Sequence, residues 1–277
     1  MAEIKLVPKN LPDRIPLEAE NISCDKFAGK SIEEIKKLPI NRGNKTENLE
    51  VYFNISGSKA DNASDLKIII EGDVRKIKNI GLKMTAGEIL IKGSAGMHTA
   101  DRLAGGKVTV EGDVGDFCAT EMKKGEFIVR GSAGNYLGSG YRGNWEGMMG
   151  GKITVDGNVG KESAAWLKGK TAIIEIGGNA DIFLGIHQHR GVIVIKGNVA
   201  PRVGAEMAGG TIVSLGKIEE ILPSFKFIEE VPSIDISEGN TIKGPFLKFQ
   251  GDLAQRSAKK QKGAIYAIKS KNGHLIK

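Results

Sequence analysis

The stretch Gly105-Gly106-Lys107-Val108-Thr109-Val110-Glu111-Gly112-Asp113-Val114-Gly115 returns, little changed, as Gly150-Gly151-Lys152-Ile153-Thr154-Val155-Asp156-Gly157-Asn158-Val159-Gly160. Looser copies start at positions 87, 125, 191 and 209. The glycine that closes each apolar run returns in steps of 21, 19, 19, 26, 21, 19 and 19 residues, at Gly72, Gly93, Gly112, Gly131, Gly157, Gly178, Gly197 and Gly216. A period near 20 residues is typical of chains that stack one repeat on the next.

Each copy carries the pattern of a short strand with one buried face. Val108 and Val110 alternate with Thr109 and Glu111, and the following Gly-Asp or Gly-Asn pair predicts a turn. The sequence therefore predicts an all-β fold: a right-handed parallel β-helix solenoid of about 7–8 coils with N- and C-terminal capping segments. An antiparallel sandwich or barrel is the alternative, but hairpins do not require a constant step.

The repeat divides the 277 residues into three predicted parts. Residues 1–66 form an N-terminal extension with a short helix and a strand, residues 67–216 the glycine-repeat β-helix, and residues 217–277 a C-terminal cap and basic tail. Ser31-Ile32-Glu33-Glu34 predicts a helix that starts with a capping box, which outweighs the likeness of residues 28–31 to the end of a phosphate-binding loop. Residues 49–56 alternate like a strand.

The charge is concentrated at the C-terminus. The formal net charge is +7, and seven basic residues without an acidic one follow Asp252: Arg256, Lys259, Lys260, Lys262, Lys269, Lys271 and Lys277. Without a nucleic-acid-binding module, such a tail favours an acidic protein partner over a nucleic acid. With two cysteines and no apolar run of about 20 residues, we expect a cytoplasmic protein that makes no membrane contact.

Few side chains in the sequence follow the pattern of a catalytic or metal-binding site. His187 and His189 would face the same side of a strand, but a metal site needs further ligands, and none is evident; their role stays open. Cys24 and Cys118 do not form the motif of an iron–sulfur protein. We therefore predict no catalytic, cofactor-binding or metal-binding residues in this chain.

One repeat is longer than the others. The step of 26 residues contains the insertion Gly140-Tyr141-Arg142-Gly143-Asn144-Trp145-Glu146-Gly147. Tyrosine, arginine and tryptophan are enriched at binding hot spots, and insertions in repeat proteins form surface loops. Tyr141, Arg142 and Trp145 are therefore the candidate subunit interface, with a plain surface loop as the equal alternative.

The repeated phrase resembles the glycine-repeat family that contains the C-terminal domain of the glutamate synthase large subunit and the C subunit of formylmethanofuran dehydrogenase. The C subunit is the closer resemblance, and it covers most of the chain. It rests on the flanking segments Ile15–Ala19, Phe27–Ile35, Tyr141–Met148, Glu206–Ile212 and Lys248–Asp252.

The resemblance implies a non-catalytic structural subunit of a methanogenic complex that reduces carbon dioxide and fixes it as formylmethanofuran. The implied partners are amidohydrolase-like, molybdopterin or tungstopterin, and iron–sulfur subunits. They would carry a dinuclear metal site, a molybdenum or tungsten pterin and iron–sulfur clusters. Two alternatives remain open at this point: the C subunit of a bacterial formyltransferase/hydrolase complex, and a stand-alone β-helix carbohydrate-active enzyme.

Overall fold

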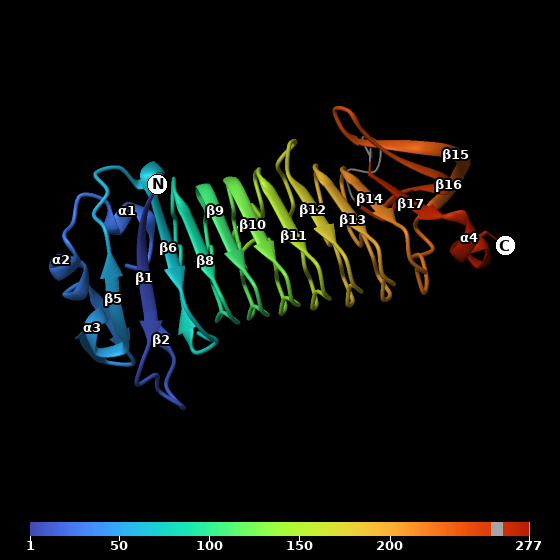
Figure 1. Cartoon of the computed structure of the whole chain (residues 1–277). Coiled ribbons are helices and arrows are strands. Elements are labelled where there is room, and N and C mark those ends of the chain that lie inside the picture. The colour runs from blue at the N-terminus through green and yellow to red at the C-terminus, as the bar shows by residue number, and fades with distance from the viewer. Residues whose placement is uncertain (256–262, 277) are drawn as a thin grey trace.

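A computed structural model describes residues 1–255 and 263–276. Its main feature is a sheet of 13 strands that runs along the molecule, in the order β15-β16-β17-β14-β13-β12-β11-β10-β9-β8-β6-β1-β5 (Figure 1). The middle of this sheet contains one strand from each repeat, and each pairs in parallel with the next. These strands are β6 (Leu66–Ile70), β8 (Glu88–Ile91), β9 (Ala104–Val110), β10 (Lys124–Val129), β11 (Lys152–Val155), β12 (Ile173–Ile176), β13 (Val192–Ile195) and β14 (Thr211–Ser214).

The core lies between this sheet and a second line of contacts. Ile91 aligns with Val110, which aligns with Val129, so equivalent apolar residues stack along the sheet and are buried. On the other side, each repeat makes one isolated parallel bridge, such as Val114 to Ala133. The period of the repeat therefore sets the register of the core.

Two further strands of the large sheet and a separate small sheet complete the N-terminal end. β1 (Ala2–Pro8) pairs in parallel with β6, and β5 (Phe53–Gly57) pairs antiparallel with β1. A separate four-stranded sheet has the order β4 (Lys45–Asn48), β3 (Pro39–Arg42), β2 (Leu17–Glu18) and β7 (Ile77–Lys78). The short helices here are α1 (Cys24–Phe27), α2 (Ile32–Lys36), α3 (Leu49–Tyr52) and the 3-10 turn η1 (Ala63–Asp65).

Two predictions from local sequence patterns concern this end, and the structure agrees with one of them fully and with the other in part. The capping box is confirmed, because the Ser31 side chain accepts from the amide of Glu34 and the Glu34 carboxylate accepts from the amide of Ser31. The strand predicted over residues 49–56 is half wrong. Its first part is α3, which buries Leu49 and Tyr52 on one side, and only its second part belongs to β5.

A hairpin and a short helix cover the C-terminal end. β17 (Ala264–Ile268) pairs in parallel with β14, β16 (Asn240–Gln250) antiparallel with β17, and β15 (Lys226–Ser237) antiparallel with β16. Ile236 and Phe246 of the hairpin pack with Val194 and Val213 on the outer face of the sheet. The chain then forms α4 (Lys269–Asn272) and the 3-10 turn η3 (Gly273–Leu275).

The prediction of an all-β, right-handed parallel β-helix is wrong. The described residues form one mixed 13-stranded sheet and one 4-stranded sheet, with short α-helices at both ends. On the side opposite the large sheet, the first repeat adds the strand β7 to the four-stranded sheet, whereas each later repeat contributes one bridge followed by turns. Those turns alternate residues of positive φ, such as His98 and Ala100, which is incompatible with extended strands.

Two kinds of glycine explain the repeated phrase. A Cβ atom at Gly93 would lie 2.6 Å from the carbonyl oxygen of Gly72, so the closing position has no room for a side chain. Gly106, within β9 just before its apolar run, has φ +71°, which favours glycine. From Ser94 onward, the residue after the closing glycine links the repeats: the Ser132 amide donates to Asp113 Oδ1 at 2.8 Å, and this pattern continues through Asn158, Asn179 and Asn198.

The division into residues 1–66, 67–216 and 217–277 stays a prediction, since one sheet runs through all three parts. Of the basic tail, Lys269 and Lys271 lie in α4, and Lys269 pairs with Glu230 at 2.7 Å. Four tail residues and the last one lie outside the described residues: Arg256, Lys259, Lys260, Lys262 and Lys277. Over residues 1–255 and 263–276, no helix is long and apolar enough to cross a membrane.

Candidate interaction site around the inserted loop

The turns that follow the bridge residues present two rows of side chains. In the repeat of His98, the residues at positions 98, 100 and 102 have positive φ, and so do most of the equivalent residues of the other repeats. The middle position is small and buried, as at Ala100. We call the outer positions the first and second row. The first row is His98, Phe117, Tyr136, Glu162, Phe183 and Arg202, and the second is Arg102, Glu121, Trp166, His187 and Glu206.

Rings and ion pairs stack along both rows. The Phe117 ring lies between those of His98 and Tyr136, and the ring planes are nearly parallel. The centroid of Phe117 lies 5.4 Å from that of His98 and 4.5 Å from that of Tyr136. In the second row, Trp166 stacks on His187 at 3.9 Å, and Arg102 Nε donates to Glu121 Oε2 at 2.9 Å. Because each repeat places its residue beside the equivalent one, the period of the chain assembles these contacts.

The inserted loop is fixed across these rows. At its two ends, the amides of Gly140 and Gly147 donate to the carbonyls of Ala165 and Trp166, at 3.1 and 3.0 Å. In the loop, Asn144 Nδ2 donates to Glu121 Oε1 at 2.7 Å. The insertion is therefore an ordered part of the surface, held by backbone and side-chain hydrogen bonds.

Tyr141 extends from this loop toward the N-terminal repeats. Its hydroxyl lies 2.9 Å from Nδ1 of His98, and the Arg102 guanidinium lies 5.1 Å from the centre of its ring. Its ring also stacks on Phe117, at 5.9 Å. Tyr141 thus joins three side chains from two repeats, and it is only partly exposed.

The three predicted interface residues have different surroundings. Tyr141 is held by contacts within the chain, whereas Arg142 is exposed and lines a hollow of about 410 Å³ together with Tyr136 and Trp166. Trp145 keeps 64% of its surface exposed. Its ring packs edge-on against the Trp166 ring, with the two ring centroids 4.7 Å apart. Arg142 and Trp145 are therefore available to a partner, and Tyr141 supports the loop.

Sequence reasoning missed His98, Arg102, Glu121 and Trp166. The signal was present, because His98, Phe117 and Tyr136 follow one another at the 19-residue step. It was not recognisable as a surface row without knowing that their backbones share a positive φ.

Several ionisable groups around the inserted loop have pKa values that differ from their usual ones. Burial raises the pKa of the Asp101 carboxyl from 3.8 to about 6, although the Arg102 charge and the Tyr141 hydroxyl oppose that shift. Burial lowers the pKa of His98 below its usual 6.5, and the charges of Lys78 and Arg102 lower it further. Burial works to raise the pKa of Glu121, but hydrogen bonds from Arg102 and Asn144 leave it lowered overall. Clusters of this kind mark candidate functional sites.

The two histidines whose role the sequence left open belong to the second row or adjoin it. His187 Nδ1 lies 3.5 Å from Glu206 Oε2, and the His189 ring lies 6.0 Å from Trp166. In the described ranges, no group of three or more His, Cys, Asp or Glu residues is arranged to hold a metal ion. Aromatic and charged rows of this kind suit the recognition of another molecule.

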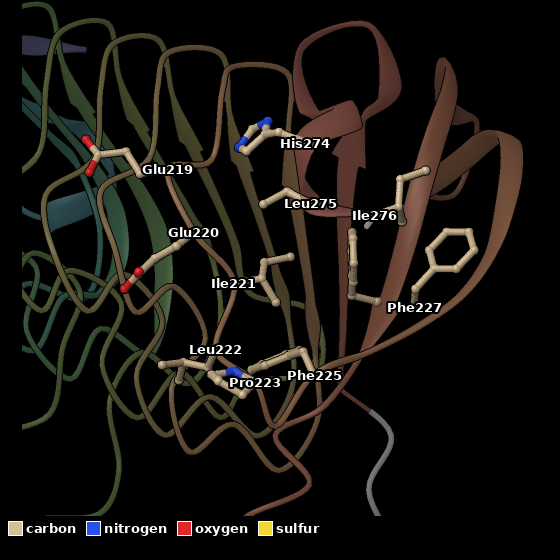
Figure 2. Close-up of a pocket in the computed structure, with 11 residues that line it drawn as sticks. Glu219, Glu220, Ile221, Leu222, Pro223, Phe225, Phe227, His274, Leu275 and Ile276 are labelled. Atoms are coloured by element: carbon tan, nitrogen blue, oxygen red, sulfur yellow. The ribbon is translucent and has the colours of Figure 1, made fainter.

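A larger hollow, of about 610 Å³, lies at the C-terminal end of the stack. Figure 2 shows the side chains of Ile221, Leu275 and Ile276 within it, whereas the carboxylates of Glu219 and Glu220 lie to one side. Phe227, at its outer end, is 38% exposed. This hollow is mostly apolar and brings together few groups that could bind a polar ligand.

Comparisons with known proteins place this chain among relatives of known name, although no family model matches it. It is 48% identical over 275 residues to the C subunit of the tungsten-containing formylmethanofuran dehydrogenase 2 of Methanothermobacter thermautotrophicus, with 99% of each chain covered. It is 44% identical over 267 residues to the same subunit of Methanococcus maripaludis, with 95% of each chain covered.

One relative matches over only part of the chain, and one solved structure matches over nearly all of it. The C subunit of the molybdenum-containing formylmethanofuran dehydrogenase 1 of Methanosarcina barkeri is 50% identical over 98 residues, which is 35% of this chain and 32% of that one. Among solved structures, a chain of the formyltransferase/hydrolase complex from Methylorubrum extorquens, in complex with methylofuran, superposes with a TM-score of 0.79 at 22% identity, over 95% of this chain and 99% of that one. The latter similarity shows a shared fold.

Proposed function

This chain belongs to the family of the C subunits of the formylmethanofuran dehydrogenases, and from that membership we propose that it is a non-catalytic structural subunit that scaffolds the catalytic subunits of such a complex. The observation that carries the proposal is the similarity to the tungsten-containing relatives over nearly the whole length of both chains. In this proposal, the complex reduces carbon dioxide and attaches the product to methanofuran as a formyl group.

The donor groups of the chain support a role without a cofactor of its own. An iron–sulfur cluster needs several cysteine thiolates, but burial raises the pKa of both Cys24 and Cys118 to about 12. The chain's residues therefore do not fit a cluster. We propose that the molybdenum or tungsten pterin, the iron–sulfur clusters and a dinuclear metal site belong to other subunits, with an amidohydrolase-like subunit among them.

The inserted loop is the surface that we propose for contact with those subunits. Trp145 presents a large exposed ring on a loop that hydrogen bonds hold in place, so docking would cost little conformational entropy. Arg142 adds an exposed cation beside it. Arginine and tryptophan are residue types that dominate binding energies at protein interfaces.

We further propose that the complex is of the tungsten-containing type. The relatives that match over the whole chain bear that name, whereas the molybdenum-containing relatives match over about a third of the chain. The metal content of the purified complex tests this directly. Molybdenum in place of tungsten would contradict it.

We keep the cytoplasmic location as part of the proposal, with the unpaired Cys24 and Cys118 as its support.

The bacterial formyltransferase/hydrolase alternative has a weaker basis, since the similarity there is of fold. A carbohydrate-active enzyme would need two carboxylates facing one substrate. Along the sheet, carboxylates such as Glu175 and Asp156 instead pair with Lys152 and Arg130.

Affinity purification of the tagged chain from its native host, followed by mass spectrometry, tests the proposed function. We expect the pterin, iron–sulfur and amidohydrolase-like subunits to co-purify in fixed ratios. The isolated chain should bind no metal and convert no substrate. A chain that purifies without partners, or that hydrolyses a polysaccharide alone, would overturn the proposal.

A further inference from the structure

A small polar pocket lies where three distant parts of the chain meet. Its volume is about 230 Å³. The N-terminal extension contributes Glu18 and Glu20, the first repeats contribute Lys78, Asn79, Leu82, His98, Asp101 and Arg102, and the inserted loop contributes Tyr141. We call it the Asp101 pocket. Since a water molecule takes about 30 Å³ of liquid volume, the pocket has room for a larger group.

Asp101 is the unusual member of this pocket. The residue is only 4% exposed, and its Oδ1 atom has no hydrogen-bond partner among the described residues. The nearest cationic group to its other oxygen, Oδ2, is Arg102 Nη1 at 3.8 Å. A buried carboxylate oxygen without a donor is costly, and such groups are usually explained by a ligand or an ion.

The charges in the pocket favour a cation. Three carboxylates line it, from Glu18, Glu20 and Asp101, against the two cations Lys78 and Arg102. Both cations already have another carboxylate neighbour: Lys78 lies 3.9 Å from Glu18, and Arg102 lies 2.9 Å from Glu121. Asp101 is therefore left with the Tyr141 hydroxyl and the more distant charges of Arg102 and Lys83, and the pocket lining holds one more carboxylate than cations.

A ligand of this pocket would have to donate hydrogen bonds to its carboxylates. A bare metal ion is disfavoured, because the described residues contain no suitable group of three or more His, Cys, Asp or Glu ligands. Glu20 Oε1 receives only a long hydrogen bond from Asn79, at 3.4 Å. A guanidinium or ammonium group carries several N–H donors with a positive charge, and so it could serve both carboxylates.

We propose that the Asp101 pocket receives the cationic head group of an arginine or lysine side chain from a partner subunit. The inference rests on the proposed function and adds a site to it. Tyr141 lines this pocket and also the hollow beside Arg142 and Trp166, so the pocket continues the surface of the inserted loop. The raised pKa of Asp101 agrees with a carboxylate whose cation is supplied from outside the chain.

The test uses the complex purified through a tag on this chain. Asp101→Asn removes the charge with little change of shape, and Glu20→Gln does the same at the pocket rim. Glu111→Gln is the matched control, because Glu111 is an exposed carboxylate in a neighbouring repeat outside the pocket. The dissociation constant for the partner subunits is measured for each variant at two salt concentrations, with circular dichroism to check the fold.

We expect Asp101→Asn to weaken the binding of partner subunits at least about tenfold, since removing one member of a buried charge pair at an interface is costly. Glu20→Gln should weaken it less, and Glu111→Gln should bind like the wild type. If both pocket variants bind like the wild type, the pocket proposal is wrong while the proposed function stands. If the wild-type chain itself retains no partner, the proposed function fails.

Discussion

The hydroxyl of Tyr141 lies 2.9 Å from Nδ1 of His98, although the two residues are 43 positions apart in the chain. The contact spans more than one repeat, because Tyr141 belongs to the insertion, and the loop reaches back over Phe117. It joins the exposed loop to the Asp101 pocket. A partner that docks on the loop would therefore contact both an apolar ring and a buried carboxylate.

Trp145→Ala should weaken the assembly of the complex while leaving the fold intact. The ring is mostly exposed in the free chain, so its loss should change the free energy of unfolding by less than about 0.5 kcal/mol. If Trp145 is an interface anchor, its replacement should weaken the affinity for the partner subunits about tenfold or more. Gel filtration of the reconstituted complex measures the loss. Val51→Ala serves as the control, since Val51 is an exposed apolar residue of α3. An unchanged elution profile for Trp145→Ala would contradict the prediction that Trp145 is an interface residue.

Asp101→Asn should stabilise the isolated chain in a pH-dependent way. Near pH 4 the carboxyl is largely protonated in the folded chain, so the two proteins should unfold alike. The stability that protonation contributes is lost as the pH rises through about 6, because the folded chain must then hold a buried charge. At about pH 7.5 the variant should be more stable than the wild type by at most about 3 kcal/mol. Urea unfolding at both pH values measures the difference, and an equal difference at the two would contradict the prediction.

Asn272→Ala should destabilise the C-terminal end of the stack. Asn272 is fully buried; its Oδ1 accepts from the amide of Ile218 at 2.8 Å, and its Nδ2 donates to the carbonyls of Gly216 and Ile268 at 2.9 Å. It thereby pairs backbone groups of Gly216 and Ile218, at the end of the last repeat, and of Ile268, next to α4. Removing it leaves them unpaired, so we expect a loss of about 2 to 4 kcal/mol in the free energy of unfolding. Lys271→Ala, exposed on the same helix, should change it by less than about 0.5 kcal/mol.

Both cysteines should be unreactive in the folded chain. Burial raises the pKa of the Cys24 and Cys118 thiols to about 12, so the reactive thiolate is scarce at about pH 8. An aromatic disulfide reagent should label neither residue before denaturation and both after it. Rapid labelling of either thiol in the folded chain would show that the site opens.

The sequence by itself determined how the repeats stack. Each repeat pairs with the next one along the chain, so the spacing of the apolar runs is enough to align Val110 with Val129 and to require glycine where backbones meet, as at Gly93. The capping box at Ser31 is equally local, because its partners are three residues apart.

Only the tertiary structure decided the rest, because it depends on groups that are distant in the chain or on backbone angles that side-chain patterns do not reveal. We expected further sheets around the core, but the residues after each bridge alternate positive φ values and form turns. The antiparallel hairpin of β15 and β16 packs on the sheet through Ile236 and Phe246, which no repeat predicts. Asp101 and Tyr141 line one pocket because the inserted loop folds back across neighbouring repeats, and this juxtaposition carries the proposed binding site.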